Sequence, residues 1–131
     1  MADEGATGEL IRYRRAGGMA GLDQRLSVDA DGRAALEDRK SRSSTEIVAD
    51  ASEIEGLRVL IDQVPRGRWH GVLGTFVQRV IPRGHNPMRF QLRRGRRRID
   101  GVAGVSDADL GPLLAQLDEL LARCVRERRQ R

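Results

Sequence analysis

The sequence predicts an α+β domain in which two helices pack on one face of an antiparallel β-sheet. Three observations predict it. Several short segments alternate apolar and polar residues with period two, as half-buried strands do. Two longer segments repeat apolar residues every three or four positions, as amphipathic helices do. The order of the segments is strands, helix, strands, helix, which favours one sheet with both helices laid over one face.

The length of 131 residues leaves room for one domain with one core. We expect a disordered lead-in over residues 1–8, a single domain over 9–126 and a basic, fraying tail over 127–131. No apolar stretch approaches the ~18 residues of a membrane span, and the polar N-terminus does not resemble a secretory signal. The expected location is therefore the cytoplasm, with no membrane partner.

The first half of the chain predicts strands joined by turns. Residues 9–15 form the first expected strand, and residues 22–29 form a second, on which Leu22, Gln24, Leu26 and Val28 share one face. Asp31-Gly32 is typical of a two-residue type I′ turn, after which residues 33–38 return as the partner strand.

The middle of the chain predicts a polar connector, a short strand and a helix. The connector covers residues 39–45 and the strand residues 46–49. Ser52 and Glu55 have the spacing of a capping box, and the apolar repeat behind them predicts a helix over residues 53–63. Pro65 ends it.

The second half predicts loops and strands before a closing helix. The expected loops cover residues 66–74 and 82–87, and the expected strands cover residues 75–81, 88–93 and 97–102. Ser106 or Asp109 is expected to cap the last helix, with Pro112 in its first turn. An apolar stripe then runs to about residue 126: Leu110, Leu113, Leu114, Leu117, Leu120, Leu121 and Cys124.

The residues that carry catalysis or bind metals are sparse and badly spaced. His70 and His85 lie fifteen positions apart in expected loops, without the close pairing of metal ligands. Cys124 lies on the apolar stripe, where it is expected to be a small buried side chain. No nucleophile elbow, phosphate loop or dinucleotide fingerprint is present. We therefore expect no enzyme activity, no cofactor and no metal.

Charge is distributed unevenly along the chain. Residues 1–65 hold 9 basic and 13 acidic side chains, a net of −4, whereas residues 66–131 hold 15 and 6, a net of +9. Five arginines cluster on an expected hairpin: Arg93, Arg94, Arg96, Arg97 and Arg98. They would suit a nucleic acid or another anionic surface. Alternatively they are solvated side chains on an exposed sheet face, and the segment lacks the aromatics that stack on bases.

The segment Ala16-Gly17-Gly18-Met19-Ala20-Gly21 joins the first two expected strands. One interpretation is a wide hairpin connection that needs positive φ. The other is a binding loop, because Met19 has no obvious core to join, and glycines would let a partner approach the backbone closely.

The stretch IRYRRAGGMAGLDQRLSVDADGRAAL resembles the opening of the emfourin family, proteinaceous inhibitors of protealysin and other thermolysin-type metalloproteases. Members of that family have a Ser-Gly-Gly-Phe-Ala-Gly-like loop, where this chain has Ala16 and Met19 in place of the serine and the aromatic residue. The closing helix with its leucines is also similar. The resemblance implies a small α/β inhibitor that blocks the cleft of a zinc protease and is neither an enzyme nor a metal binder.

The leading hypothesis is therefore a protein that occupies or covers a metalloprotease cleft with loop 16–21. Met19 would fill an apolar subsite, and the glycines would permit backbone hydrogen bonds. Arg14 and Arg15 would meet acidic groups at the rim. The expected partner-binding residues are Arg14, Arg15, Gly17, Gly18, Met19 and Gly21. The alternatives are binding of a nucleic acid or acidic surface by the arginine cluster, and an accessory subunit of a larger assembly.

Overall fold

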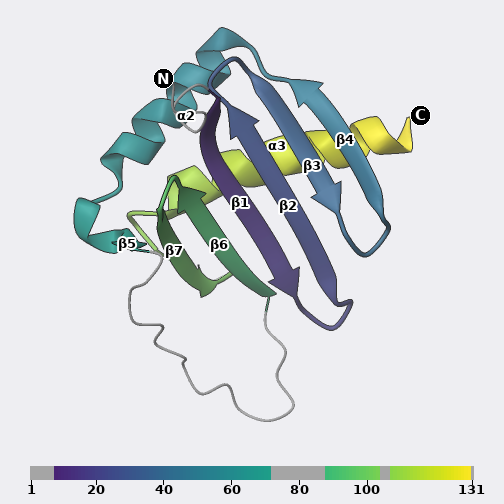
Figure 1. Ribbon diagram of the computed structural model, residues 1–131, viewed down its shortest axis with the longest axis horizontal. Coiled ribbons are helices and arrows are strands. Elements are labelled where there is room, and N and C mark those ends of the chain that lie inside the picture. Colours follow the sequence, from purple (N-terminus) through teal and green to yellow (C-terminus); the bar gives the residue numbers. More distant parts are fainter. Residues whose placement is uncertain (1–7, 72–87, 104–106, 131) are drawn as a thin grey trace.

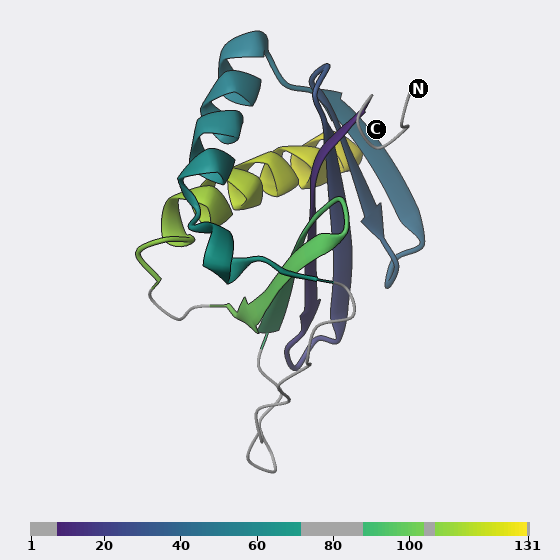
Figure 2. The same ribbon diagram turned by 60° about the vertical axis from the view of Figure 1, so that its left-hand side comes forward.

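A computed structural model describes residues 8–71, 88–103 and 107–130 of the chain. Its centre is a seven-stranded antiparallel sheet in the order β4-β3-β2-β1-β6-β7-β5 (Figure 1). The strands are β1 (Glu9–Gly17), β2 (Leu22–Asp29), β3 (Arg33–Asp38), β4 (Ser43–Val48), β5 (His70–Gly71), β6 (Met88–Arg94) and β7 (Arg97–Val102). Helices α2 (Ala51–Gln63) and α3 (Gly111–Arg129) both lie on one side of the sheet (Figure 2). The predicted α+β plan is confirmed.

Alternation along the strands separates a helix-covered face from an open face. Tyr13 stands opposite Leu26 on one side and Leu92 on the other, and all three are buried under the helices. Leucines and one cysteine of α3 complete the core from above, together with apolar residues of α2. The buried residues of α3 are Leu113, Leu117, Leu120, Leu121 and Cys124. The predicted stripe therefore packs on the protein's own sheet.

Polar contacts from several elements tie α3 to the rest of the molecule. The Tyr13 hydroxyl donates to Asp118 Oδ1 at 2.6 Å, and Arg128 Nη1 donates to Asp38 Oδ2 at 3.1 Å. Arg123 of α3 forms an ion pair with Glu53 of α2. Because these contacts reach from β1, β3 and α2, they fix the direction in which α3 crosses the sheet.

Both helices begin differently from the prediction. Asp50 caps α2: its side chain accepts from the Glu53 amide at 2.8 Å, and the Glu53 side chain accepts from the Asp50 amide at 3.2 Å. The expected box from Ser52 is wrong, because the chain turns helical two residues earlier. The N-cap of α3 is Leu110 without a side-chain cap, so Asp109 is not the cap, and Ser106 lies outside the described residues.

The C-terminal arginines also differ from the prediction. Helix α3 continues to Arg129, three residues past the expected end at 126. Arg128 is held by Asp38, Ser41 and Ser43, so this part of the expected basic tail is integral to the domain. The lead-in lies outside the described residues except Gly8, whose carbonyl accepts from the Ala30 amide at 2.7 Å.

Two other expectations need correction. The turn between β2 and β3 is not type I′, because positive φ occurs at Gly32 (104°) and not at Asp31. The Gly32 amide donates to the Asp29 carbonyl at 3.1 Å, and a Cβ at Gly32 would lie 2.6 Å from the Ala49 carbonyl oxygen. Strand β4 begins at Ser43, inside the expected connector, because its polar residues pair with β3.

The segment between α2 and β6 is only partly described. Residues 66–71, expected as loop, contain a 3₁₀ turn (Arg66–Arg68) and the two-residue β5. The rest of that loop, the expected strand 75–81 and the expected loop 82–87 lie outside the described residues.

Candidate functional site

The β1–β2 turn, residues 18–21, is a tight and well-specified loop. The Gly21 amide donates to the Gly18 carbonyl at 3.1 Å, which closes a four-residue turn. Gly17, Gly18 and Gly21 have φ of 106°, 73° and 63°, a left-handed conformation that strains any residue with a Cβ. The glycines therefore satisfy a structural need, as one of the two interpretations of this segment proposed.

Met19 stands at the tip of this turn with its side chain entirely in solvent. Its relative exposure is 102%, compared with 71% for Val48 and 46% for Val59, the other large exposed apolar residues of the described part of the chain. A fully exposed methionine gains nothing from burial in the monomer. The prediction that Met19 has no core to join is confirmed.

A second turn, between β3 and β4, supports the first. The Lys40 ammonium donates to the Ala20 carbonyl, which links the two turns at the same end of the sheet. Asp38 organises the second turn by accepting from the Lys40 and Ser41 amides at 3.1 and 3.2 Å. Burial would raise the pKa of Asp38, but these amides and Arg128 outweigh it and hold the pKa below its usual value. The sequence did not predict this contact, because Lys40 and Ala20 lie 20 positions apart and no local pattern relates them.

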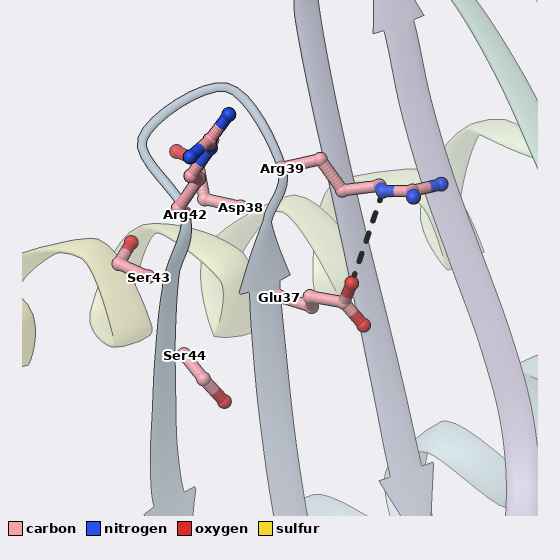
Figure 3. Close-up of a pocket in the computed structure, with 6 residues that line it drawn as sticks. All are labelled: Glu37, Asp38, Arg39, Arg42, Ser43 and Ser44. Carbon is pink, nitrogen blue, oxygen red and sulfur yellow. Dashed lines mark ion pairs between the residues drawn. The ribbon is translucent and has the colours of Figure 1, made fainter.

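The second turn also borders an open hollow of about 350 Å³. Six residues line it: Glu37, Asp38, Arg39, Arg42, Ser43 and Ser44 (Figure 3). Its charges are already matched, since Arg39 Nε lies 3.9 Å from Glu37 Oε1 and Asp38 is bound by Arg128. Among the lining residues, Arg42 is the one exception, a charged group without an ion pair to a described residue, and the open hollow does not form a small-molecule pocket.

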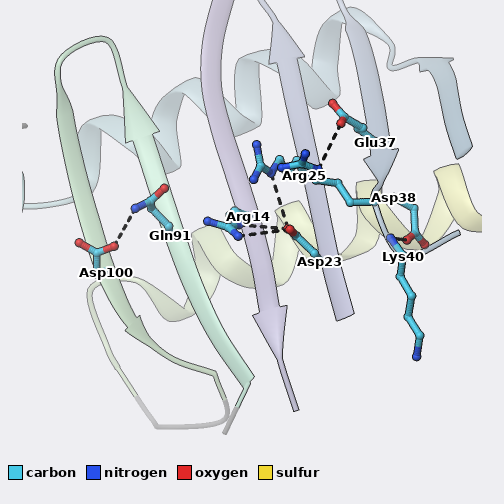
Figure 4. A network of polar contacts seen from close by, with 9 residues as sticks. Arg14, Asp23, Arg25, Glu37, Asp38, Lys40, Gln91 and Asp100 are labelled. Carbon is cyan, nitrogen blue, oxygen red and sulfur yellow. Dashed lines mark hydrogen bonds and ion pairs between the residues drawn. The ribbon is translucent and has the colours of Figure 1, made fainter. Parts of the chain in front are cut away.

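Arg14 and Arg15 lie on opposite faces of the sheet. Arg14 makes two hydrogen bonds to Asp23, at 3.0 and 3.2 Å, in a network on the open face (Figure 4). Partial burial would raise the pKa of Asp23, but Arg14 and Arg25 outweigh this effect and hold the pKa below its usual value. Arg15 lies on the helix-covered face, 3.5 Å from Asp118. The structure therefore does not bring these two arginines together beside the loop.

The arginine cluster forms the β6–β7 hairpin, as expected, with Gly95 at φ 60° in its turn. The strands divide the five side chains. Arg93 and Arg98 are paired across the open face, whereas Arg94 lies 3.7 Å from Asp62 of α2. Arg96 lies in the turn, and Arg97 pairs with Arg94. The cluster is therefore two groups with different surroundings.

Of the candidates for catalysis or metal binding, the structure describes Cys124 and His70, which lie in different surroundings. Cys124 is fully buried, its thiol lies 3.8 Å from the Ala34 carbonyl, and burial raises the pKa of the thiol to about 11. His70 is exposed on β5, and His85 lies outside the described residues. Within the described ranges, no three His, Cys, Asp or Glu side chains are grouped so as to hold a metal ion.

The helices of the described residues include none that is long and apolar enough to cross a membrane. No family model matches the chain, and comparisons with curated proteins and with solved structures found no significant similarity.

Proposed function

We propose that this protein is a non-enzymatic binding protein that inserts the β1–β2 turn into the cleft of a partner protein, with a thermolysin-type metalloprotease as the partner class. The observation that carries the proposal is the complete exposure of Met19 at the tip of a turn whose backbone is fixed. The resemblance of residues 11–36 to inhibitors of such proteases supplies the partner class.

The turn suits insertion because little order has to be gained on binding. Gly18 and Gly21 are held by their mutual hydrogen bond, and Lys40 binds the Ala20 carbonyl from the neighbouring turn. A loop already in its bound conformation avoids much of the entropy cost of association. The flexible thioether of Met19 adapts to apolar subsites of varied shape.

The groups that flank the loop would contact the rim of the cleft. Arg39, Lys40 and Arg42 are exposed on the β3–β4 turn, beside the β1–β2 turn. We assign to Lys40 and Arg42 the rim contacts first expected of Arg14 and Arg15, because Arg14, Arg15 and Arg39 already have acidic partners at Asp23, Asp118 and Glu37. An acidic rim would be matched by these cations and would speed association at low salt.

The test is a titration of a thermolysin-type protease with the protein, followed by hydrolysis of a peptide substrate. The native protein should inhibit, and Met19→Asp should weaken inhibition by a factor of roughly ten or more, as for a residue that fills a pocket. Val59→Asp is the matched control, since Val59 is also exposed but lies on α2.

Two results would contradict the proposal. One is the absence of inhibition by the native protein at micromolar excess over several thermolysin-type proteases. The other is equal weakening by Met19→Asp and Val59→Asp, which would place the contact elsewhere.

A further inference from the structure

We infer that the open face of the sheet carries a second binding surface, for the phosphate backbone of a nucleic acid, formed by the basic row Arg12, Arg93, Arg98 and His70. This surface does not depend on the function proposed for the turn at residues 18–21. It differs from the arginine cluster visible in the sequence, because it adds two residues from distant strands and leaves out Arg94, Arg96 and Arg97.

Strand register creates the row. Arg12 of β1 stands opposite Arg93 of β6, Arg93 stands opposite Arg98 of β7, and Arg98 stands opposite His70 of β5. Cross-strand partners project from the same face, and their neighbours Leu92 and Ile99 point into the core, so the row lies on the open face. With roughly 4.8 Å between strands, four basic side chains span roughly 14 Å.

Acidic side chains do not fully neutralise the row. Arg12 Nε is 2.6 Å from Glu9, and Arg98 Nε is 3.3 Å from Asp100. Arg93, between them, has no ion pair with any described residue. The segment from Met88 to Ala103 holds six arginines and one acid, a net of +5 that equals the formal charge of the whole chain.

Like charges placed directly opposite each other destabilise a sheet, so three arginines in register are unfavourable for the isolated protein. Elsewhere on the open face, Arg14 and Arg25 also stand directly opposite each other, but both form an ion pair with Asp23. Gln91 donates to its cross-strand partner Asp100 at 3.0 Å (Figure 4). An anion bound along the row would remove the repulsion.

The side chains favour phosphate over other anions. The guanidinium fork binds phosphate oxygens in pairs, and all three arginines present such forks. Tyr13, Trp69 and Phe90 are all buried, so within the described ranges no Phe, Tyr or Trp side chain is exposed beside the row for bases to stack on. The expected binding is therefore to the backbone, independent of base sequence and steeply dependent on salt.

The experiment measures binding of a labelled mixed-sequence single-stranded oligonucleotide by fluorescence anisotropy, between roughly 50 and 200 mM salt. The variant is Arg12→Ser/Arg93→Ser/Arg98→Ser. Its matched control, Arg25→Ser/Arg33→Ser/Arg39→Ser, removes the same charge from β2, β3 and the β3–β4 turn. Each lost phosphate contact should lower the log–log salt slope by about 0.7, so the row variant should lose about 2 and the control much less.

The single variant Arg93→Ser should leave the fold intact, because Arg93 has no ion pair with the described residues. It should lower the salt slope by about 0.7.

Three results would overturn the inference. They are no binding by the native protein at low salt, equal loss in the row variant and the control, and competition by poly-glutamate as effective as that of unlabelled oligonucleotide. The last would mean an acidic protein surface as the ligand. Protease inhibition should be unchanged in the row variant, since Arg12 lies five residues from Gly17 along β1.

Discussion

The two faces of the sheet are made from alternate residues of the same strands, but they use charge differently. On the helix-covered face, charged groups occur where a helix supplies a partner: Arg15 lies beside Asp118, and Asp38 binds Arg128. On the open face, charges pair across strands, as Arg14 does with Asp23, or have no described ion pair, as with Arg93. Whether an arginine contributes to the packing of the domain therefore depends on whether its face of the sheet is covered by the helices.

The same difference predicts an asymmetry in energy. Exposed ion pairs contribute about 0–1 kcal/mol each, whereas loss of a buried leucine side chain costs several times more. Stability should therefore reside on the helix-covered face, which leaves the open face available for binding.

The largest effect is expected from Leu117→Ala, in the middle of the buried side of α3. Leu117 is fully buried, and the change should lower the free energy of unfolding by about 2–5 kcal/mol. Urea denaturation would measure it. Because the stripe packs on the protein's own sheet, the midpoint should not depend on protein concentration. A variant as stable as its parent would show that α3 contributes little to the covered face.

A smaller effect is expected from Gly101→Ala, where the covered face has no room for a methyl group. A Cβ at Gly101 would lie 2.5 Å from the ring of Phe90, its cross-strand partner. Overpacking of this kind costs about 1–3 kcal/mol. Thermal unfolding should show the loss, and Phe90→Leu in the same chain should recover part of it. Full stability of the single variant would mean that the Phe90 ring moves freely.

Asp38 on the helix-covered face and Asp23 on the open face allow a direct comparison of the two faces. Both Asp38 and Asp23 have pKa values below the usual one, so each stabilises the fold above the unfolded pKa of about 3.9. That contribution is lost as pH falls through the folded pKa. Asp38→Asn should lower the free energy of unfolding by about 1–2 kcal/mol at pH 7, because the part-buried hydrogen bonds that Asp38 accepts from Arg128 and two amides weaken.

Asp23→Asn should cost less, because its partners Arg14 and Arg25 are half exposed. Unfolding midpoints measured from pH 7 to pH 2 would separate the two variants, and each should show less acid destabilisation than the parent. Equal losses at neutral pH would remove the asymmetry between the faces.

The smallest effect is expected from Arg33→Ser on the open face. The Arg33 and Asp31 side chains are each 64% exposed and 3.8 Å apart, so the change should stay within about 0.5 kcal/mol in urea denaturation. A loss comparable to that of Gly101→Ala would show that the open face also stabilises the fold.

Local patterns in the sequence were enough for most of the elements. Period-two alternation predicted β2 with its observed bounds, and the turns expected at Asp31-Gly32 and Gly95 predicted β3 and β7 with theirs. The leucine repeat predicted α3 and the burial of Cys124. Such patterns are reliable because they record which side of each element is apolar. The exposure of Met19 followed from the same reasoning, since its glycine-rich segment offered no apolar face.

Other features depended on contacts that no local pattern contains. Two pairs of residues have the spacing of a capping box: Asp50 with Glu53, and Ser52 with Glu55. The structure uses the first pair, in which Glu53 also forms an ion pair with Arg123 of α3.

The sequence by itself determined an antiparallel sheet, two amphipathic helices, an exposed methionine turn and an arginine-rich hairpin. Only the tertiary structure separated Arg14 from Arg15 and placed Arg12 beside Arg93 and Arg98. The physical reason is that strand register and helix docking are set by the whole core. Arg12 and Arg93, 81 positions apart, therefore become neighbours through packing that no short segment encodes.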